Sequence, residues 1–132
     1  MKILIAEDEP VSLKTLENML SSFGDVALAT NGEEAYREFV SALDKNQPFD
    51  LIFLDADKEN YINYFNCIIN KLNKKGVILA DNVLWSGKVA DEKQQDETTK
   101  ILREFNNMVN NDCRVETILL PIRDGISLIR KI

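Results

Sequence analysis

The sequence predicts a single α/β domain over residues 1–132, in which helices cover a mostly parallel β-sheet. Two observations carry this prediction. Short apolar runs alternate with stretches whose apolar residues recur every three or four positions, which is typical of strand–helix–strand units. The rhythm changes near the C-terminus, where two strand-like runs are joined by residues 121–125, a connection that fits only antiparallel neighbours. We therefore expect a three-layer, doubly wound sheet that ends in a hairpin.

The strands are expected at short apolar runs bounded by polar or turn-forming residues. The run at residues 49–54 is apolar throughout except for Asp50 and does not alternate, which favours a strand buried on both faces. In chain order the expected strands are residues 2–6, 26–29, 49–54, 77–80, 115–120 and 126–130.

The helices are expected where apolar residues form a stripe at helical spacing. Pro10 suits the first turn of the first helix and Gly24 ends it, and the basic pair before Gly76 suits the last turn of the third. In chain order the stripes span residues 13–23, 35–43, 61–72 and 101–109, and polar connections are expected at 45–48 and 86–95.

Composition excludes several classes of function. The 16 basic and 22 acidic residues give a net charge of −6, which leaves no basic patch for a nucleic-acid partner. The apolar runs are too short to span a membrane and the N-terminus lacks the pattern of a secretory signal, so we expect a cytoplasmic protein. Histidine is absent, which removes imidazole from any catalytic or metal site. Cys67 and Cys113 have no metal or redox spacing and are expected to be reduced, buried or half-buried thiols.

Acidic residues follow three of the first four expected strands. They are Glu7 and Asp8, then Asp55 with Asp57, then Asp81 followed by Asn82. Ligands of doubly wound sheets bind at the carboxyl ends of the strands, and carboxylates about 4 Å apart repel by roughly 4 kcal/mol unless a proton or a cation joins them. Oxygen ligands without His or Cys favour Mg²⁺ or Ca²⁺. Each acid taken alone also fits a helix cap or a turn, so both interpretations stay open for the single residues.

The first part of the chain resembles bacterial response-regulator receiver domains. The segments that carry the resemblance are ILIAEDEP at 3–10, ATNGEEA at 29–35 and FDLIFLD at 49–55. The resemblance implies that Asp8, helped by Glu7, holds Mg²⁺ and that Asp55 accepts a phosphoryl group. After Asp55 the sequence departs from the receiver pattern, because the fourth strand ends in Ala80 and Asp81 rather than in a hydroxyl residue.

From about residue 49 to residue 132 the chain is similar to cation-dependent O-methyltransferases of the caffeoyl-CoA and catechol type, which use S-adenosylmethionine. The segments that carry this resemblance are DADKENY at 55–61, DNVLWSGKV at 81–89 and LPIRDG at 120–125. The resemblance implies that Asp55, Asp81 and Asn82 are metal ligands, that Lys58 is the catalytic base and that Trp85 lies at the mouth of the substrate site.

The methyl-donor site of that family depends on a glycine-rich turn after the first strand. This chain has Glu7, Asp8, Glu9 and Pro10 there, with no glycine, and the donor's carboxylate would meet acids instead of free N–H groups. We therefore expect S-adenosylmethionine and a small-molecule substrate to bind poorly, and no residue is assigned to the donor.

Together, the two resemblances predict a mosaic made by recombining fragments: a receiver-like half at 1–49 and a methyltransferase-like half at 50–132. The expected sheet is a hybrid of flavodoxin-like and Rossmann-like folds with strand order 2-1-3-4-6-5, the last strand lying antiparallel between the fourth and the fifth. The predicted state is a folded chain with little or no parental activity and a vestigial divalent-cation site formed by Glu7, Asp8, Asp55, Asp81 and Asn82. Two alternatives stay open: an active cation-dependent methyltransferase of a catechol-type substrate, and a phosphoacceptor receiver. A second copy could pair with the exposed edge strand at Val26.

Overall fold

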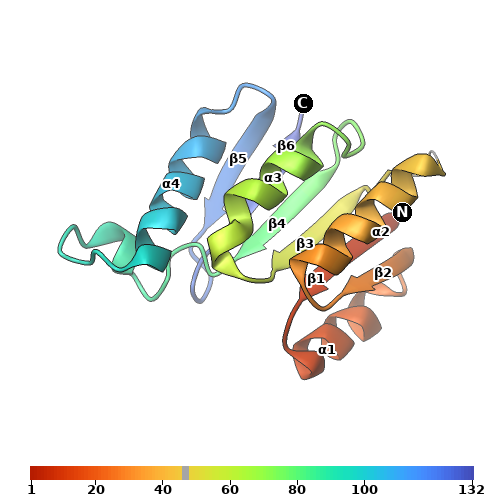
Figure 1. The fold of residues 1–132 in the computed structure, drawn as a ribbon, viewed down its shortest axis with the longest axis horizontal. Coiled ribbons are helices and arrows are strands. Elements are labelled where there is room, and N and C mark those ends of the chain that lie inside the picture. The colour runs from red at the N-terminus through yellow and green to blue at the C-terminus, as the bar shows by residue number, and fades with distance from the viewer. Residues whose placement is uncertain (46–47) are drawn as a thin grey trace.

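The computed structural model describes residues 1–45 and 48–132 (Figure 1). Six strands form one sheet: β1 Lys2–Glu7, β2 Asp25–Ala29, β3 Leu51–Asp55, β4 Val77–Asp81, β5 Val115–Leu120 and β6 Ile126–Lys131. The helices between them are α1 Pro10–Leu20, α2 Gly32–Asp44, α3 Tyr61–Ile69 and α4 Glu97–Asn111, with 3₁₀ turns η1 Lys58–Asn60 and η2 Lys88–Ala90.

The strand order is β2-β1-β3-β4-β6-β5, which confirms the predicted topology. The first four strands run parallel, and β6 lies antiparallel between β4 and β5. The β5–β6 hairpin therefore replaces a further strand–helix crossover at this side of the sheet.

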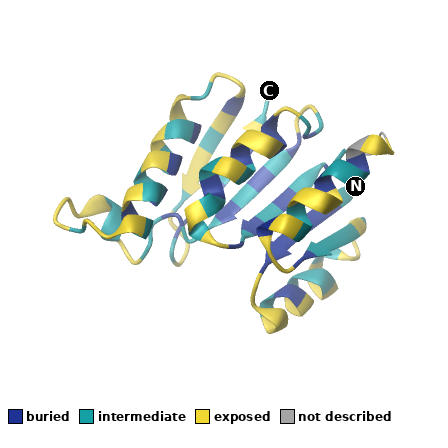
Figure 2. Ribbon diagram, viewed as in Figure 1, coloured by how far each residue is buried: buried dark blue, intermediate teal, exposed yellow. Residues whose placement is uncertain are grey.

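Helices cover the two faces of the sheet unequally (Figures 1 and 2). The larger core lies under α2, α3 and α4 and includes Leu4 of β1 together with Phe39, Phe65 and Phe105. The smaller core lies under α1, where Ile3, Ile5 and Leu13 pack together. Because successive residues of a strand point to opposite faces, β1 is buried from both sides.

Several predicted boundaries are wrong. α1 ends at Leu20 and Phe23 is 64% exposed, so the apolar stripe stops before Gly24. β3 begins at Leu51 instead of residue 49, because Phe49 is fully buried against the Phe39 ring before pairing starts. Cys67 and Cys113 are both exposed, so the expectation of buried or half-buried thiols is wrong. The predicted connection at 45–48 falls partly outside the described residues.

None of the helices in the described part of the chain has the length and apolar character needed to cross a membrane.

Candidate functional site

The carboxyl ends of β1, β3 and β4 bring four of the predicted site residues to one cavity. Glu7 is the register partner of Asp55 on neighbouring parallel strands, and Asp81 ends the next strand. With Asn82, these three acids line a cavity of about 410 Å³ that α1 and the β5–β6 turn close from the sides. The topology therefore converts separate strand ends into one acidic site, as the sequence predicted.

Three predicted residues do not line this cavity. Lys58 contacts Asp55 but is not part of the cavity lining. Asp8 is exposed, and the cavity wall next to Glu7 is formed by α1 side chains instead. Trp85 is half-buried and packs against the larger core beneath α4. The cavity lining therefore does not include Asp8, which is predicted as a metal ligand, or Trp85, which is predicted at the substrate mouth. Both residues lie on loops, and the strand pattern does not set the direction of a loop.

Glu7 and Asp55 form a carboxyl pair. Burial, with the nearby charge of Asp55, raises the pKa of Glu7 from 4.5 to about 7, although the backbone N–H of Glu9 donates to its Oε1 at 2.9 Å. Burial also raises the pKa of Asp55, against the opposing effect of Lys58. The protonated Glu7 hydrogen-bonds to the Asp55 carboxylate, so the pair shares one proton near neutral pH.

Lys58 contacts both Asp55 and the buried Tyr61 through its ammonium group. Its ammonium group forms an ion pair with Asp55 Oδ1 and donates to the Tyr61 hydroxyl at 2.6 Å, and its side chain is only 11% exposed. Lys58 comes three residues after Asp55 in the sequence. The η1 turn between β3 and α3 brings its side chain back to the Asp55 carboxylate. Two polar contacts therefore hold Lys58, and it is not a solvated surface lysine.

Tyr61 is a site residue that sequence reasoning missed. It was assigned to the apolar stripe of α3, and the structure buries it completely against the Phe105 ring. Its hydroxyl donates to the carbonyl oxygens of Leu54 at 2.9 Å and Asp81 at 3.0 Å, which ties the ends of β3 and β4 together. The available signal was its place in the DADKENY segment, three residues after Lys58.

The loop after β4 is fixed by the hairpin turn. The N–H groups of Val83 and Leu84 donate to the carbonyls of Gly125 and Asp124 at 3.1 and 2.8 Å. Gly125 has φ 84°, and a Cβ there would lie 2.4 Å from Leu84 Cγ, so only glycine fits. This attachment holds Asp81 and Asn82 at the cavity, with Asn82 itself at φ 57°.

Arg103 of α4 holds the rest of this loop and was also not singled out by the sequence. Its guanidinium donates to the backbone carbonyls of Lys88, Val89, Asp91 and Gln94 at 2.6 to 3.0 Å. One half-buried cation thus organises the polar segment that the sequence predicts at residues 86–95.

The donor chemistry of the cavity fits a hard divalent cation. Glu7, Asp55, Asp81 and Asn82 supply only oxygen ligands, which are the type that Mg²⁺ and Ca²⁺ prefer. Within residues 1–45 and 48–132, however, no three Asp, Glu or Cys side chains converge closely enough to enclose a metal ion. Lys58 instead provides the positive charge that faces Asp55.

The N-terminus of α1 does not fit an anionic ligand. The Glu9 carboxylate caps this helix and accepts from the N–H groups of Val11 at 3.0 Å and Ser12 at 2.6 Å. These are the amides that would otherwise receive a ligand carboxylate at the first strand–helix turn.

Comparison with known proteins places the chain in a family. The sequence profile described as O-methyltransferase matches residues 28–132, more than half of the chain. The chain belongs to the O-methyltransferase family. A caffeoyl-CoA O-methyltransferase of *Petroselinum crispum* is 39% identical over 90 residues, which cover 64% of this chain and 37% of that protein. The chain thus spans about two fifths of the length of this curated relative.

Solved O-methyltransferase structures share the fold over nearly the whole chain. An SAH-bound methyltransferase of *Podospora anserina* matches with a TM-score of 0.69 and 24% identity, and covers 98% of this chain and 71% of that one. An O-methyltransferase of *Bacillus cereus* in complex with SAH matches with a TM-score of 0.67 and 19% identity, and covers 98% and 73%. Identities this low establish similarity of fold only.

The O-methyltransferase match begins before the predicted junction. It starts at residue 28 and so includes α2, which the sequence assigned to a receiver-like half ending at 49. The comparisons therefore support the methyltransferase assignment beyond the range predicted for it, while the receiver-like origin of the first residues stays a prediction.

Proposed function

We propose that this chain carries the acceptor-activating site of a cation-dependent O-methyltransferase and that it binds the methyl donor weakly. The observation that carries the proposal is a connected set of four residues: Asp55 and Asp81 line the acidic cavity, and Lys58 and Tyr61 contact them from outside its lining. Membership of the O-methyltransferase family supports it. Because the chain spans only part of the relatives' length, activity of the whole protein is itself part of the proposal.

Asp55, Asp81 and Asn82 would hold a divalent cation at this site. When bound, the cation supplies positive charge that lowers the pKa of an acceptor hydroxyl. Lys58 would act as the general base at Nζ after its ammonium proton has passed to solvent, because only the neutral amine can take the hydroxyl proton, and its contact with Asp55 places it next to the cavity. Tyr61 keeps Lys58 in place through its hydroxyl, and Asp55 holds it through the ion pair.

Weak donor binding follows from the first strand–helix turn. The Glu9 carboxylate occupies the α1 amides, and Glu7 and Asp8 add further negative charge beside them. A donor carboxylate would have to displace Glu9 and approach these acids, so S-adenosylmethionine is expected to bind far more weakly than the cation.

Thermal unfolding with and without Mg²⁺ tests the cation site. A ligand that binds only the native state raises Tm, so millimolar Mg²⁺ should raise the Tm of the wild type. Asp55→Asn should lose this shift. Asp8→Asn is the matched control, because Asp8 is a nearby acid that does not line the cavity, and it should keep the shift. An equal shift in the wild type and Asp55→Asn, or none in the wild type, contradicts the proposed site.

Calorimetric titration with S-adenosylmethionine tests the donor part. The wild type should show weak binding or none, and Glu9→Ala should bind more tightly, because the variant frees the α1 amides. Tight binding by the wild type would overturn the proposal of weak donor binding and favour an active methyltransferase, without affecting the cation result.

The mosaic origin and the receiver alternative lead to a separate test. A receiver would require Asp55 to accept a phosphoryl group, and Lys58 and Glu7 already occupy that carboxylate. Beryllofluoride should therefore leave the Tm unchanged; a rise that Asp55→Asn abolishes would favour the receiver function. Pairing of a second copy with β2, which lies at the edge of the sheet next to β1, is likewise a proposal that size-exclusion chromatography with light scattering can test.

A further inference from the structure

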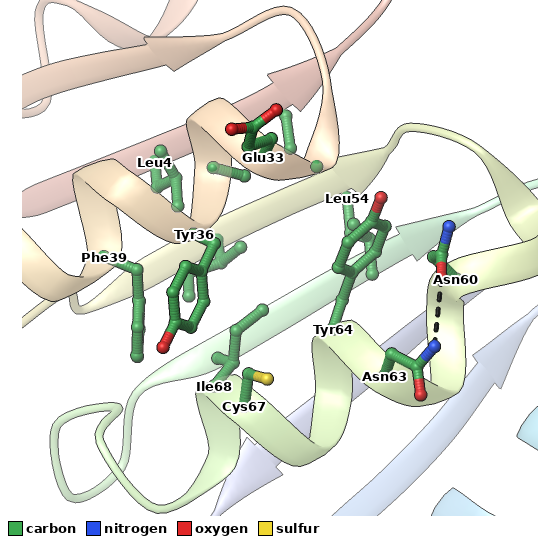
Figure 3. A pocket seen from close by; sticks show the side chains of 14 residues that line it. Leu4, Glu33, Tyr36, Phe39, Leu54, Asn60, Asn63, Tyr64, Cys67 and Ile68 are labelled. Carbon is green, nitrogen blue, oxygen red and sulfur yellow. Dashed lines mark hydrogen bonds between the residues drawn. The ribbon is translucent and has the colours of Figure 1, made fainter.

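A second cavity lies on the opposite face of the sheet from the acidic site. It has a volume of about 340 Å³ and opens between α2 and α3 (Figure 3). The acidic site uses Glu7 and Asp55, whereas this cavity uses the adjacent strand positions Ala6 and Leu54, which point the other way. The two cavities are therefore separated by the sheet itself.

The walls of this cavity are almost entirely apolar. The sheet supplies the floor and the two helices supply facing walls, with aromatic rings on both sides (Figure 3). The apolar lining residues are Leu4, Ala6, Ala35, Tyr36, Phe39, Ile52, Leu54 and Ile68. An apolar cavity of about 150 Å³ is large enough to bind benzene, and small-molecule sites start near about 300 Å³, so this cavity can hold two fused rings.

The rim of the cavity is polar and carries charges of both signs, because Glu33 is ion-paired with Arg37 and Lys71 Nζ lies 5.6 Å from the centre of the Phe39 ring. Glu33 lies on the α2 side, and Asn60, Asn63 and Tyr64 lie on the α3 side. Tyr64 donates its hydroxyl to Asp57, and Asn63 Nδ2 donates to Asn60 Oδ1 at 3.0 Å. The rim thus offers acceptor oxygens to a ligand, whereas a ligand carboxylate would lose its hydration against the apolar walls.

The rim also has a fixed shape. A Cβ at Gly32 would lie 1.7 Å from the Tyr64 hydroxyl oxygen, so the absence of a side chain at Gly32 allows the Tyr64 ring to stand at the opening. Burial and the Asp57 carboxylate raise the pKa of Tyr64, which keeps this ring a neutral phenol.

We propose that the cavity between α2 and α3 binds a neutral aromatic molecule of two fused rings that carries a single hydroxyl or N–H donor. The rings occupy the apolar space above Leu4 and Ile52, and the donor meets the acceptor oxygens of the rim. This site is independent of the proposed cation site, because no residue lines both cavities.

Cys67 provides a direct readout. Its thiol lines the cavity and is exposed, whereas Cys113 is exposed elsewhere on the chain and lines neither cavity. The experiment measures the alkylation rate of each cysteine by mass spectrometry with a neutral reagent, in the presence of 2-naphthol. At ten times Kd, a ligand that shields the thiol slows alkylation of Cys67 about eleven-fold by mass action and leaves the rate at Cys113 unchanged. The anion 2-naphthoate should give little or no protection.

Two substitutions check where the ligand binds. Ala35→Leu places extra atoms in the cavity and should abolish the protection, while Ala90→Leu adds the same atoms at an exposed position outside it and should not. Cys67→Leu serves as a second filling variant, with 2-naphthol fluorescence as the readout. Circular dichroism identifies any variant that fails to fold.

Three results would overturn the proposal. They are no slowing of Cys67 alkylation by 2-naphthol, equal slowing at Cys113, and equal protection by the anion. Protection that persists in folded Ala35→Leu, together with unchanged fluorescence binding in Cys67→Leu, would also exclude this cavity as the site.

Discussion

Replacing Glu7 with glutamine should stabilise the protein at pH 8 and have a much smaller effect at pH 5. Glu7 is 4% exposed, and burial together with Asp55 raises its pKa from 4.5 to about 7. In the unfolded chain the pKa of Glu7 returns to its ordinary value of 4.5. Between pH 4.5 and about pH 7 the native state therefore holds a proton that the unfolded state has released. The free energy of unfolding therefore falls as the pH rises through this window.

The magnitude follows from the size of the shift. One pKa unit corresponds to about 1.4 kcal/mol, and glutamine is neutral at every pH. The free energy of unfolding of Glu7→Gln should therefore exceed that of the wild type by about 3 kcal/mol at pH 8 and by about 1 kcal/mol at pH 5. Glutamine keeps the contacts, because its amide can donate to Asp55 and its oxygen can accept from the Glu9 N–H.

Urea unfolding from pH 5 to pH 8, in buffer containing EDTA to exclude divalent cations, measures this difference. Glu104→Gln is the matched control, because it removes a carboxylate at an exposed position of α4. Its difference from the wild type should stay small at every pH. A difference for Glu7→Gln that does not change with pH, or a loss of stability at pH 8, would refute the shared-proton description of the Glu7–Asp55 pair.

Three further substitutions test the structure around the site. Tyr61→Phe should lower the free energy of unfolding by about 1 to 3 kcal/mol, because the carbonyls of Leu54 and Asp81 lose their donor; an unchanged urea midpoint would contradict this role. Phe105→Ala should cost about 3 to 5 kcal/mol, since the ring is fully buried against Tyr61 at 5.3 Å, and a calorimetric Tm close to that of the wild type would show that the core collapses to fill the space. Glu9→Ala should speed hydrogen exchange at the first amides of α1. The cap lowers the pKa of Glu9, so its contribution is present above pH 4.5 and is lost as the pH falls, and exchange rates that match the wild type at neutral pH would argue against the cap.

The sequence predicted the secondary structure well where the pattern was periodic. Its six strands and four helices all exist, and the strand order implied by the C-terminal resemblance is confirmed. The errors lie where the pattern is weak. Phe23 has the spacing of the α1 stripe but follows the end of that helix, and the side chain of Trp85 is directed by a loop in which it has φ 51°. Loop conformation depends on distant partners such as Arg103, which have no local signature.

The sequence by itself determined which segments become strands and helices and which strands end in acids, because side-chain periodicity and end signals are local properties of the chain. Only the tertiary structure decided that Glu7 meets Asp55 and shares its proton, that Tyr61 joins β3 to β4, and that an apolar cavity opens between α2 and α3. These features depend on how far apart packed elements lie and on how much water they exclude, and neither distance nor burial is encoded by the neighbours of a residue in the sequence.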